Sequence, residues 1–149
     1  MNNPERLYPA YAAEQTVMRM YHALDRGDYS AAAGCFMPDG SWERGDIALQ
    51  GQQQILASLN QRSATLFTRH YVSNFVVLEL GGPLAKVAFA LTVYRSDTGV
   101  PPTLPVAGAV PAMLADVACE LACSDDGNWL IKRLQPCITF SAAHHSAAK

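Results

Sequence analysis

The chain has 149 residues, a length typical of one folded domain. Apolar residues make up 50% of it and charged residues 16%, a composition that supplies a packed core and argues against a disordered chain. The net charge of -2 gives no reason to expect nucleic acid or an anionic membrane as a partner, so small molecules and other proteins remain.

Neither a secretory signal nor a membrane span is predicted. The residues from Met1 to Arg6 are polar and no apolar signal-peptide core follows them. No segment approaches the roughly 20 apolar residues of a membrane-spanning helix. We expect a cytoplasmic protein without a metal or an organic cofactor. Its four cysteines show no zinc-finger spacing and are expected to be buried free thiols: Cys35, Cys119, Cys123 and Cys137.

The first half of the chain predicts three helices. The first runs from about Pro9 to Arg26, because apolar residues recur at a spacing of three and four and Gly27 suits a helix C-terminus. The second, Tyr29 to Phe36, is capped by Asp28. The third runs from Gln52 to about Ser63.

Between the second and third helices we expect a turn at Met37–Gly40 and a short strand at Ser41–Arg44, with Trp42 facing inward. A few extended residues then lead to Gly51.

The second half predicts four long strands. They run over Leu66–Leu80, Leu84–Ser96, Ala112–Cys123 and Trp129–Phe140. A long proline-containing connection, Val100–Val110, separates the middle pair, and such loops often border a site. Helices followed by antiparallel strands predict an α+β domain whose helices cover one sheet face. The tail Ser141–Lys149 is expected to be disordered, with His144 and His145 solvated.

The stretch from Thr68 to Val77 is the most informative of these strands. Its β-branched and aromatic residues alternate between two faces. We expect one face to carry Thr68, His70, Val72, Asn74 and Val76. An imidazole and a carboxamide on an apolar strip are typical of a ligand pocket wall.

Asp25 is the unusual residue of the first helix. It lies next to Tyr21 at the edge of the apolar stripe, in the last helical turn, where the helix dipole disfavours a carboxylate. Helix stability alone gives no reason for an acid there. It is either a solvated acid of the Asp-Arg-Gly-Asp turn or an acid that faces the sheet.

Several short segments, taken in order, carry a family resemblance: Tyr21–Tyr29, Cys35–Phe36, Asp39–Glu43, Gly51, Thr68–Asn74 and Asp126–Ile131. Together they resemble the SnoaL-like branch of the nuclear transport factor 2-like superfamily over about residues 8 to 140. The resemblance implies a cone-shaped α+β roll, in which a curved antiparallel sheet packs on three helices around a deep pocket. It also implies a homodimer formed through the outer sheet face.

The resemblance also suggests roles for single residues. Asp25 matches a helix aspartate of scytalone dehydratase, and His70 matches the strand histidine that this aspartate orients. The second histidine of that enzyme has no counterpart in Leu84–Ser96, and its two pocket tyrosines are replaced by Leu24 and about Arg44. Scytalone itself is therefore not the expected substrate.

These residues predict proton-transfer chemistry. A carboxylate that orients one imidazole nitrogen leaves the other free to take or give a proton. We expect Asp25 and His70 to act as an acid–base dyad of a lyase or isomerase on a small, apolar, ring-containing compound. Candidate pocket residues, for which ordinary core packing is the alternative, are Tyr21, Phe36, Trp42, Asn74 and Met113. Two other functions remain open: a non-catalytic binding protein, and a structural subunit like the β subunit of ring-hydroxylating dioxygenases.

Overall fold

The computed structural model describes residues 4–107 and 110–142, so most of the predicted tail, with His144 and His145, lies outside the described residues. The helices are α1 (Pro4–Asp25), α2 (Tyr29–Gly34) and α3 (Gly51–Asn60). The strands are β1 (Phe36–Arg44), β2 (Ile47–Gln50), β3 (Phe67–Gly81), β4 (Leu84–Ser96), β5 (Met113–Cys123) and β6 (Trp129–Ser141).

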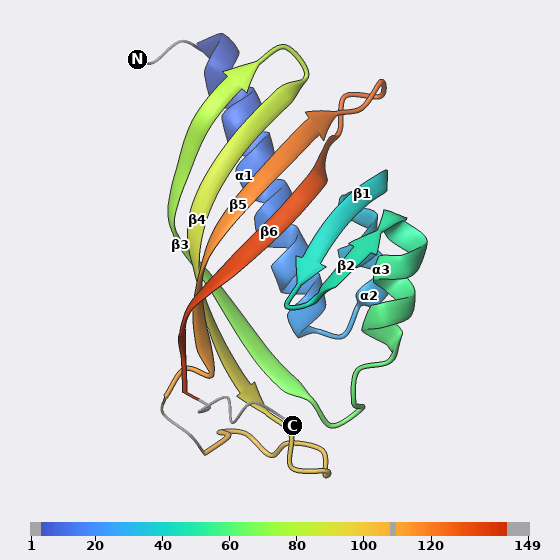
Figure 1. Cartoon of the computed structure of the whole chain (residues 1–149), viewed down its shortest axis with the longest axis vertical. Coiled ribbons are helices and arrows are strands. Elements are labelled where there is room, and N and C mark those ends of the chain that lie inside the picture. The colour runs from blue at the N-terminus through green and yellow to red at the C-terminus, as the bar shows by residue number, and fades with distance from the viewer. Residues whose placement is uncertain (1–3, 108–109, 143–149) are drawn as a thin grey trace.

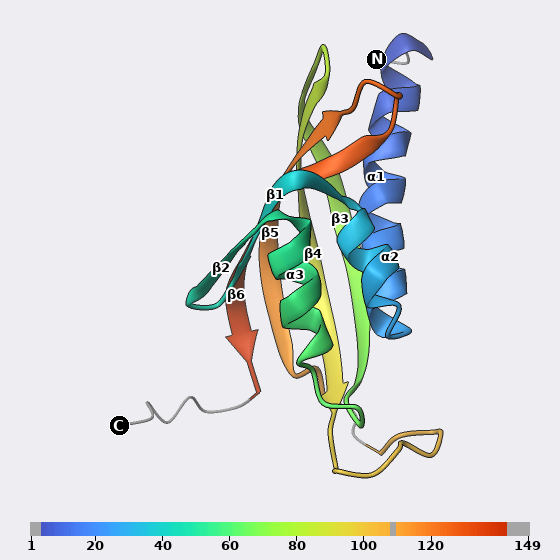
Figure 2. The ribbon, with the colours of Figure 1, turned by 90° about the vertical axis from the view of Figure 1, so that its right-hand side faces the viewer.

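One curved, open sheet forms the body of the molecule, in the order β2-β1-β6-β5-β4-β3. The helices pack on its inner face, with the long α1 running across β3 to β6 and α2 and α3 beside it (Figures 1 and 2). The predicted α+β class is confirmed. The sheet is not purely antiparallel, however, because β1 pairs with β6 in parallel.

The core lies between α1 and the inner sheet face. Val17 and Met20 of α1 and Phe36 of β1 are fully or almost fully buried, as are Leu121 and Ile131 on the sheet. Their removal from water is the main favourable contribution to folding. The buried Thr16 hydroxyl donates a hydrogen bond to the carbonyl of Trp129 (2.6 Å), which joins α1 to the start of β6.

The helix boundaries differ modestly from the prediction. α1 begins at Pro4, so Pro9 lies inside the helix rather than at its start. The ring of Pro9 removes one helical hydrogen bond, which the long helix tolerates near its exposed N-terminal end. α2 ends at Gly34 instead of Phe36, because Phe36 starts β1 and pairs with Ile131.

The predicted turn at Met37–Gly40 is part of β1. The pairing of β1 with β6 is irregular between Phe36 and Ser41, and this irregularity accommodates the turn-forming residues. A Cβ atom at Gly40 would lie 2.6 Å from the carbonyl oxygen of Ile131, so only glycine allows this approach. The short strand β2, expected only as extended chain, pairs with the end of β1.

The described structure contains free cysteines, as expected. Cys119 is buried, and Cys35 and Cys123 are partly buried. The expectation of burial is wrong for Cys137, which is exposed because it stands opposite Asp116 on the outer side of the β5–β6 ladder.

Candidate functional site

Asp25 and His70, which are 45 positions apart in the chain, form a nearly buried pair. The Nδ1 of His70 lies 2.5 Å from Oδ1 of Asp25, and their side chains are 9% and 8% exposed. The Thr68 hydroxyl donates to Oδ1 (3.0 Å), and the backbone N–H of His70 donates to Oδ2 (2.7 Å). The carboxylate therefore accepts three hydrogen bonds, all from β3.

Local structure brings the two residues together. Asp25 is the last residue of α1, and Gly27, with φ of 71°, ends the helix in the left-handed conformation that favours glycine. The Arg69 guanidinium, on the neighbouring residue of β3, donates to the backbone carbonyl of Asp25 (3.3 Å). The end of α1 is thus fixed against β3 by both the side chain and the backbone of Asp25.

The electrostatics of the pair favour an ionised carboxylate. Burial acts to raise the pKa of Asp25, but the hydrogen bonds and charge of His70, together with the Thr68 hydroxyl, outweigh it and hold that pKa below its ordinary value. An aspartate that stays ionised keeps the imidazole N–H on Nδ1. It also stabilises an imidazolium when His70 takes up a second proton.

The Nε2 atom of His70 is available for chemistry. Among the described residues it has no hydrogen-bond partner, whereas Asp25 holds Nδ1. The His70 side chain is 9% exposed, so it is not completely sealed from solvent. A compound that reaches Nε2 would meet a base in its neutral form or an acid in its protonated form.

Tyr21 supports the imidazole from the α1 side. Its ring stacks on His70, with centroids 5.2 Å apart, and meets Phe89 edge-on. Burial raises the pKa of the Tyr21 phenol, and the neighbouring Cys119 and Asp25 raise it further. The phenol therefore stays neutral and serves as a rigid aromatic wall.

Three further candidate residues lie on the inner side of the sheet but apart from the pair. Phe36 and Trp42 stack on each other with centroids 5.7 Å apart, and both are buried in the core. Met113 is half-buried at the start of β5, opposite Val93. We find no contact that joins any of these described side chains directly to His70.

The expected position of Asn74 is wrong. Its φ is 50°, and the pairing of β3 with β4 shifts register between Ser73 and Val76. The bulge reverses the alternation, so Asn74 and Val76 are exposed while Phe75 turns inward and stacks on Phe89. Asn74 therefore cannot share a pocket wall with His70.

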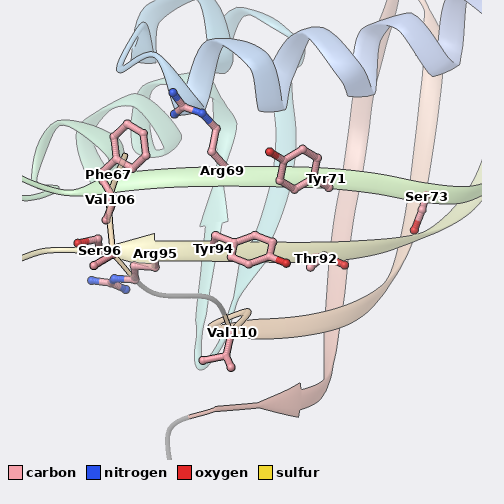
Figure 3. A pocket seen from close by; sticks show the side chains of 11 residues that line it. Phe67, Arg69, Tyr71, Ser73, Thr92, Tyr94, Arg95, Ser96, Val106 and Val110 are labelled. Atoms are coloured by element: carbon pink, nitrogen blue, oxygen red, sulfur yellow. The ribbon is translucent and has the colours of Figure 1, made fainter. Parts of the chain in front are cut away.

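A hollow of about 620 Å³ lies on the opposite side of β3 and β4 (Figure 3). Tyr71 and Tyr94 form part of its wall, and Val106 and Val110 of the long connection border it. The β3 residues that line the hollow alternate along the strand with Thr68 and His70, which face the other side of the sheet. This hollow therefore does not open onto the Asp25–His70 pair.

Sequence reasoning missed two features of the inner side. Thr68 shares the strand face of His70, and this alternation was the available signal for its role as a donor to Asp25. Arg44, Arg62 and Arg95 also gather near this end of the fold, as the charges they exert on one another show. The signal for Arg95 was its place after Phe89, Leu91 and Val93 on the apolar side of β4.

The profile of the SnoaL-like domain matches residues 7–135, which is most of the chain. The protein belongs to the SnoaL-like family. The helices packed on a curved, open sheet agree with this assignment. No curated protein matches the sequence.

Solved structures of similar fold come from several bacteria. A protein of unknown function from Mycobacterium tuberculosis has a TM-score of 0.79 at 17% identity, over 96% of this chain and 84% of that one. A Novosphingobium aromaticivorans protein named "Putative Scytalone Dehydratase" has a TM-score of 0.78 at 18% identity, covering 95% and 91%. A Catenulispora acidiphila protein has a TM-score of 0.76 at 21% identity, covering 91% and 95%. At these identities the likeness establishes the fold of the SnoaL-like domain alone.

Within the described ranges, no helix is both long and apolar enough to cross a membrane. Residues 4–107 and 110–142 also contain no group of His, Cys, Asp and Glu side chains placed to hold a metal ion.

Proposed function

We propose that this SnoaL-like protein is a cofactor-independent lyase or isomerase that moves a proton on a small, apolar, ring-containing compound. The observation that carries the proposal is the Asp25–His70 pair. One imidazole nitrogen is held at 2.5 Å by a buried carboxylate, and the other has no partner among the described residues.

The chemistry begins with neutral His70. Its Nε2 lone pair takes a proton from a carbon next to a substrate carbonyl, and the electron pair of the broken C–H bond moves into an enolate. The imidazolium that forms is stabilised by Asp25. Return of the proton to another carbon completes an isomerisation, whereas transfer to a departing hydroxyl completes a dehydration.

The environment of the pair supports this assignment. Tyr21 stacks on His70 and belongs to the apolar core of the inner side, which suits a ring-containing compound. The fold is shared with the Novosphingobium protein named as a scytalone dehydratase. Leu24 is buried and apolar and Arg44 is cationic, so neither supplies the phenol expected for turnover of scytalone.

Deuterium exchange tests the proposal without knowledge of the natural substrate. 2-Tetralone is an apolar ring ketone with exchangeable protons next to its carbonyl. We expect the protein to accelerate the incorporation of deuterium from D2O above the buffer rate, as followed by proton NMR. Because general acid–base groups contribute about 10²- to 10⁴-fold, His70→Gln and Asp25→Asn should each lose most of this acceleration.

Two matched variants control for charge and for the loss of a histidine. Asp116→Asn alters an exposed acid on the outer side of β5, and His22→Gln removes an exposed histidine of α1 that contacts Arg26. Both should exchange at the wild-type rate. Equal loss in His22→Gln and His70→Gln would remove the basis for the dyad.

The alternative is a binding protein with the same inner surface. The replacement of two phenols by Leu24 and Arg44 and the lack of a second strand histidine favour it. Saturable binding of 2-tetralone with no acceleration of exchange, in the wild type and in all variants, would select this function. A purified chain that is stable alone would count against a structural subunit that requires a larger partner.

We also propose that two chains pair through the outer sheet face. The strand register aligns Tyr71, Thr92, Leu114 and Phe140 in one row across β3 to β6. Tyr71 is 58% exposed and Phe140 is 69% exposed, an apolar surface that suits a self-complementary contact. Phe140→Asp should shift the protein from dimer to monomer in light scattering, whereas Tyr11→Asp on exposed α1 should not.

A further inference from the structure

Three arginines converge at one end of the inner side. Arg44 ends β1, Arg62 follows α3, and Arg95 lies near the end of β4, directly opposite Thr68. Burial lowers the pKa of Arg44, and the charges of Arg62 and Arg95 lower it further. Three cations that repel one another have thus been brought together from distant parts of the chain.

In this arginine cluster, none of Arg44, Arg62 and Arg95 forms an ion pair with a carboxylate in the described structure, although Asp25 acts on the Arg62 charge from a distance. The ion pairs of the described residues join Asp25 with His70, Glu79 with Lys86, and Glu43 with Arg133. Asp97 is near enough for Arg95 to help lower its pKa, yet its oxygen is held by the hydroxyls of Thr65 and Ser63. The protein therefore leaves local positive charge in a chain whose net charge is -2.

The contacts of Arg44 and Arg62 orient them without using up their donors. Arg44 donates one hydrogen bond to the Ser58 hydroxyl (3.2 Å) and lies over the Trp42 ring, 5.0 Å from its centroid. Arg62 lies 5.8 Å from the centroid of Tyr29, and its Nε is buried with no partner. A guanidinium carries five donors, and a buried donor left without an acceptor is costly.

A surface hollow of about 270 Å³ lies beside Arg44 and Arg62, and Ile47, Ser58 and Gln61 complete its lining. It is large enough for a small ligand, and its polar lining consists of groups that can donate hydrogen bonds. Planar, pre-oriented guanidinium groups bind oxyanions in a bidentate manner, better than a flexible ammonium would.

We propose that Arg44 and Arg62 bind the oxyanion group of a small molecule, a carboxylate or a phosphate, in the hollow that they line. The site lies on the same side of the fold as the Asp25–His70 pair, since the charge of Asp25 acts to raise the pKa of Arg62. If the oxyanion belongs to the compound on which the Asp25–His70 pair acts, that link rests on the function proposed above. The binding of an anion by the arginines is independent of that function.

The test uses benzoate as a carboxylate probe and inorganic phosphate as a phosphate probe. Each is titrated into the full-length protein at ionic strength held constant with sodium chloride, and the Tm and the quenching of tryptophan fluorescence are followed. A ligand that binds only the folded state raises Tm in a saturable manner. Trp42, which stacks under Arg44, should report binding directly. Tighter binding of benzoate assigns the site to carboxylates, and tighter binding of phosphate to phosphate esters.

Arg62→Met should weaken binding of the preferred probe by at least 10-fold, and Arg44→Lys, which keeps the charge but loses the planar fork, should weaken it by a smaller factor. Arg133→Met is the matched control, because Arg133 is exposed and paired with Glu43. It should bind like the wild type. Arg44→Met serves as a second probe of the hollow if Arg62→Met fails to fold.

No saturable effect of either probe, or an equal loss in Arg133→Met, overturns the anion site. Asp25→Asn separates this result from the fate of the dyad. It should abolish deuterium exchange and retain anion binding. Anion binding without exchange in the wild type would leave the anion site standing and remove the proposed catalysis alone.

Discussion

The Asp25–His70 pair and the arginine cluster lie on the same side of the sheet but differ in how their charges are satisfied. Asp25 accepts hydrogen bonds from Thr68, from the His70 ring and from the His70 backbone. Arg44 donates one hydrogen bond to Ser58, Arg62 interacts with the ring and the hydroxyl of Tyr29, and neither forms an ion pair with a carboxylate in the described structure. A paired charge contributes to folding as well as to chemistry, whereas repulsion among unpaired cations costs stability that a bound anion can recover.

The largest expected effect comes from removing the satisfied carboxylate. Asp25→Ala leaves three donors of Thr68 and His70 without their acceptor in a nearly buried site. We expect the free energy of unfolding to fall by about 3 kcal/mol, measured by urea denaturation. Asp116→Ala, at an exposed position, should change it by less than about 0.5 kcal/mol. A change at Asp25 no larger than that of the control would mean that its hydrogen bonds do not stabilise the fold.

The acid limb of the stability curve should depend on the same carboxylate. Because the folded-state pKa of Asp25 lies below its ordinary value of about 4, the unfolded state binds more protons in the window between the two. The contribution of Asp25 is therefore fully present above the ordinary pKa and is lost as the pH falls through the folded pKa. The difference in urea midpoint between wild type and Asp25→Asn should shrink as the pH falls below about 4. A difference that persists unchanged at the lowest pH would contradict an ionised Asp25.

Added salt should increase the stability contributed by the arginine cluster, whereas it should decrease the stability contributed by a pair of opposite charges. Raising sodium chloride from about 0.01 M to about 1 M shortens the Debye length from ~30 Å to ~3 Å and screens repulsion among the three guanidinium groups. We expect Arg62→Met to gain less stability from salt than the wild type, by about 0.5 kcal/mol. Arg133→Met loses an attraction to Glu43, so its salt response should shift in the other direction. Equal salt responses in both variants would show that Arg62 is already neutralised.

The dyad could be predicted from sequence and the arginine cluster could not, for a physical reason. The acid at a helix C-terminus is anomalous within its own helix, and His70 is anomalous on an apolar strand face, so each signals a site locally. Arg44 and Arg62 look like ordinary solvated residues in the sequence. Their proximity depends on the packing of α3 against β1, where Arg44 donates to Ser58, and a local sequence pattern does not indicate that contact.

Strand existence was likewise easier to predict than strand continuity. The turn-forming residues Met37–Gly40 lie within β1, in the stretch where its pairing with β6 is irregular, so the strand continues through them without regular pairing. β2 was missed because its four residues depend on the end of β1 for their hydrogen bonds. In β3 the alternation holds from Thr68 to Val72, is reversed by a first register shift between Ser73 and Val76, and is restored by a second between Val77 and Glu79.

The smallest predicted effect comes from substituting Asn74, which lies at the irregularity between Ser73 and Val76, beyond the β3 residues that bind Asp25. Asn74 is exposed, with φ of 50°, a conformation that asparagine tolerates and glycine adopts freely. Asn74→Gly should leave the free energy of unfolding within about 0.5 kcal/mol of wild type, whereas Asn74→Ala should lower it by about 1 kcal/mol because alanine strains the same backbone. Both variants should retain the deuterium exchange that depends on His70, because the Asn74 side chain is exposed and does not face the side of the sheet on which His70 lies. Loss of exchange in Asn74→Gly with unchanged stability would instead return Asn74 to the site, and would require the bulge to rearrange when a compound binds.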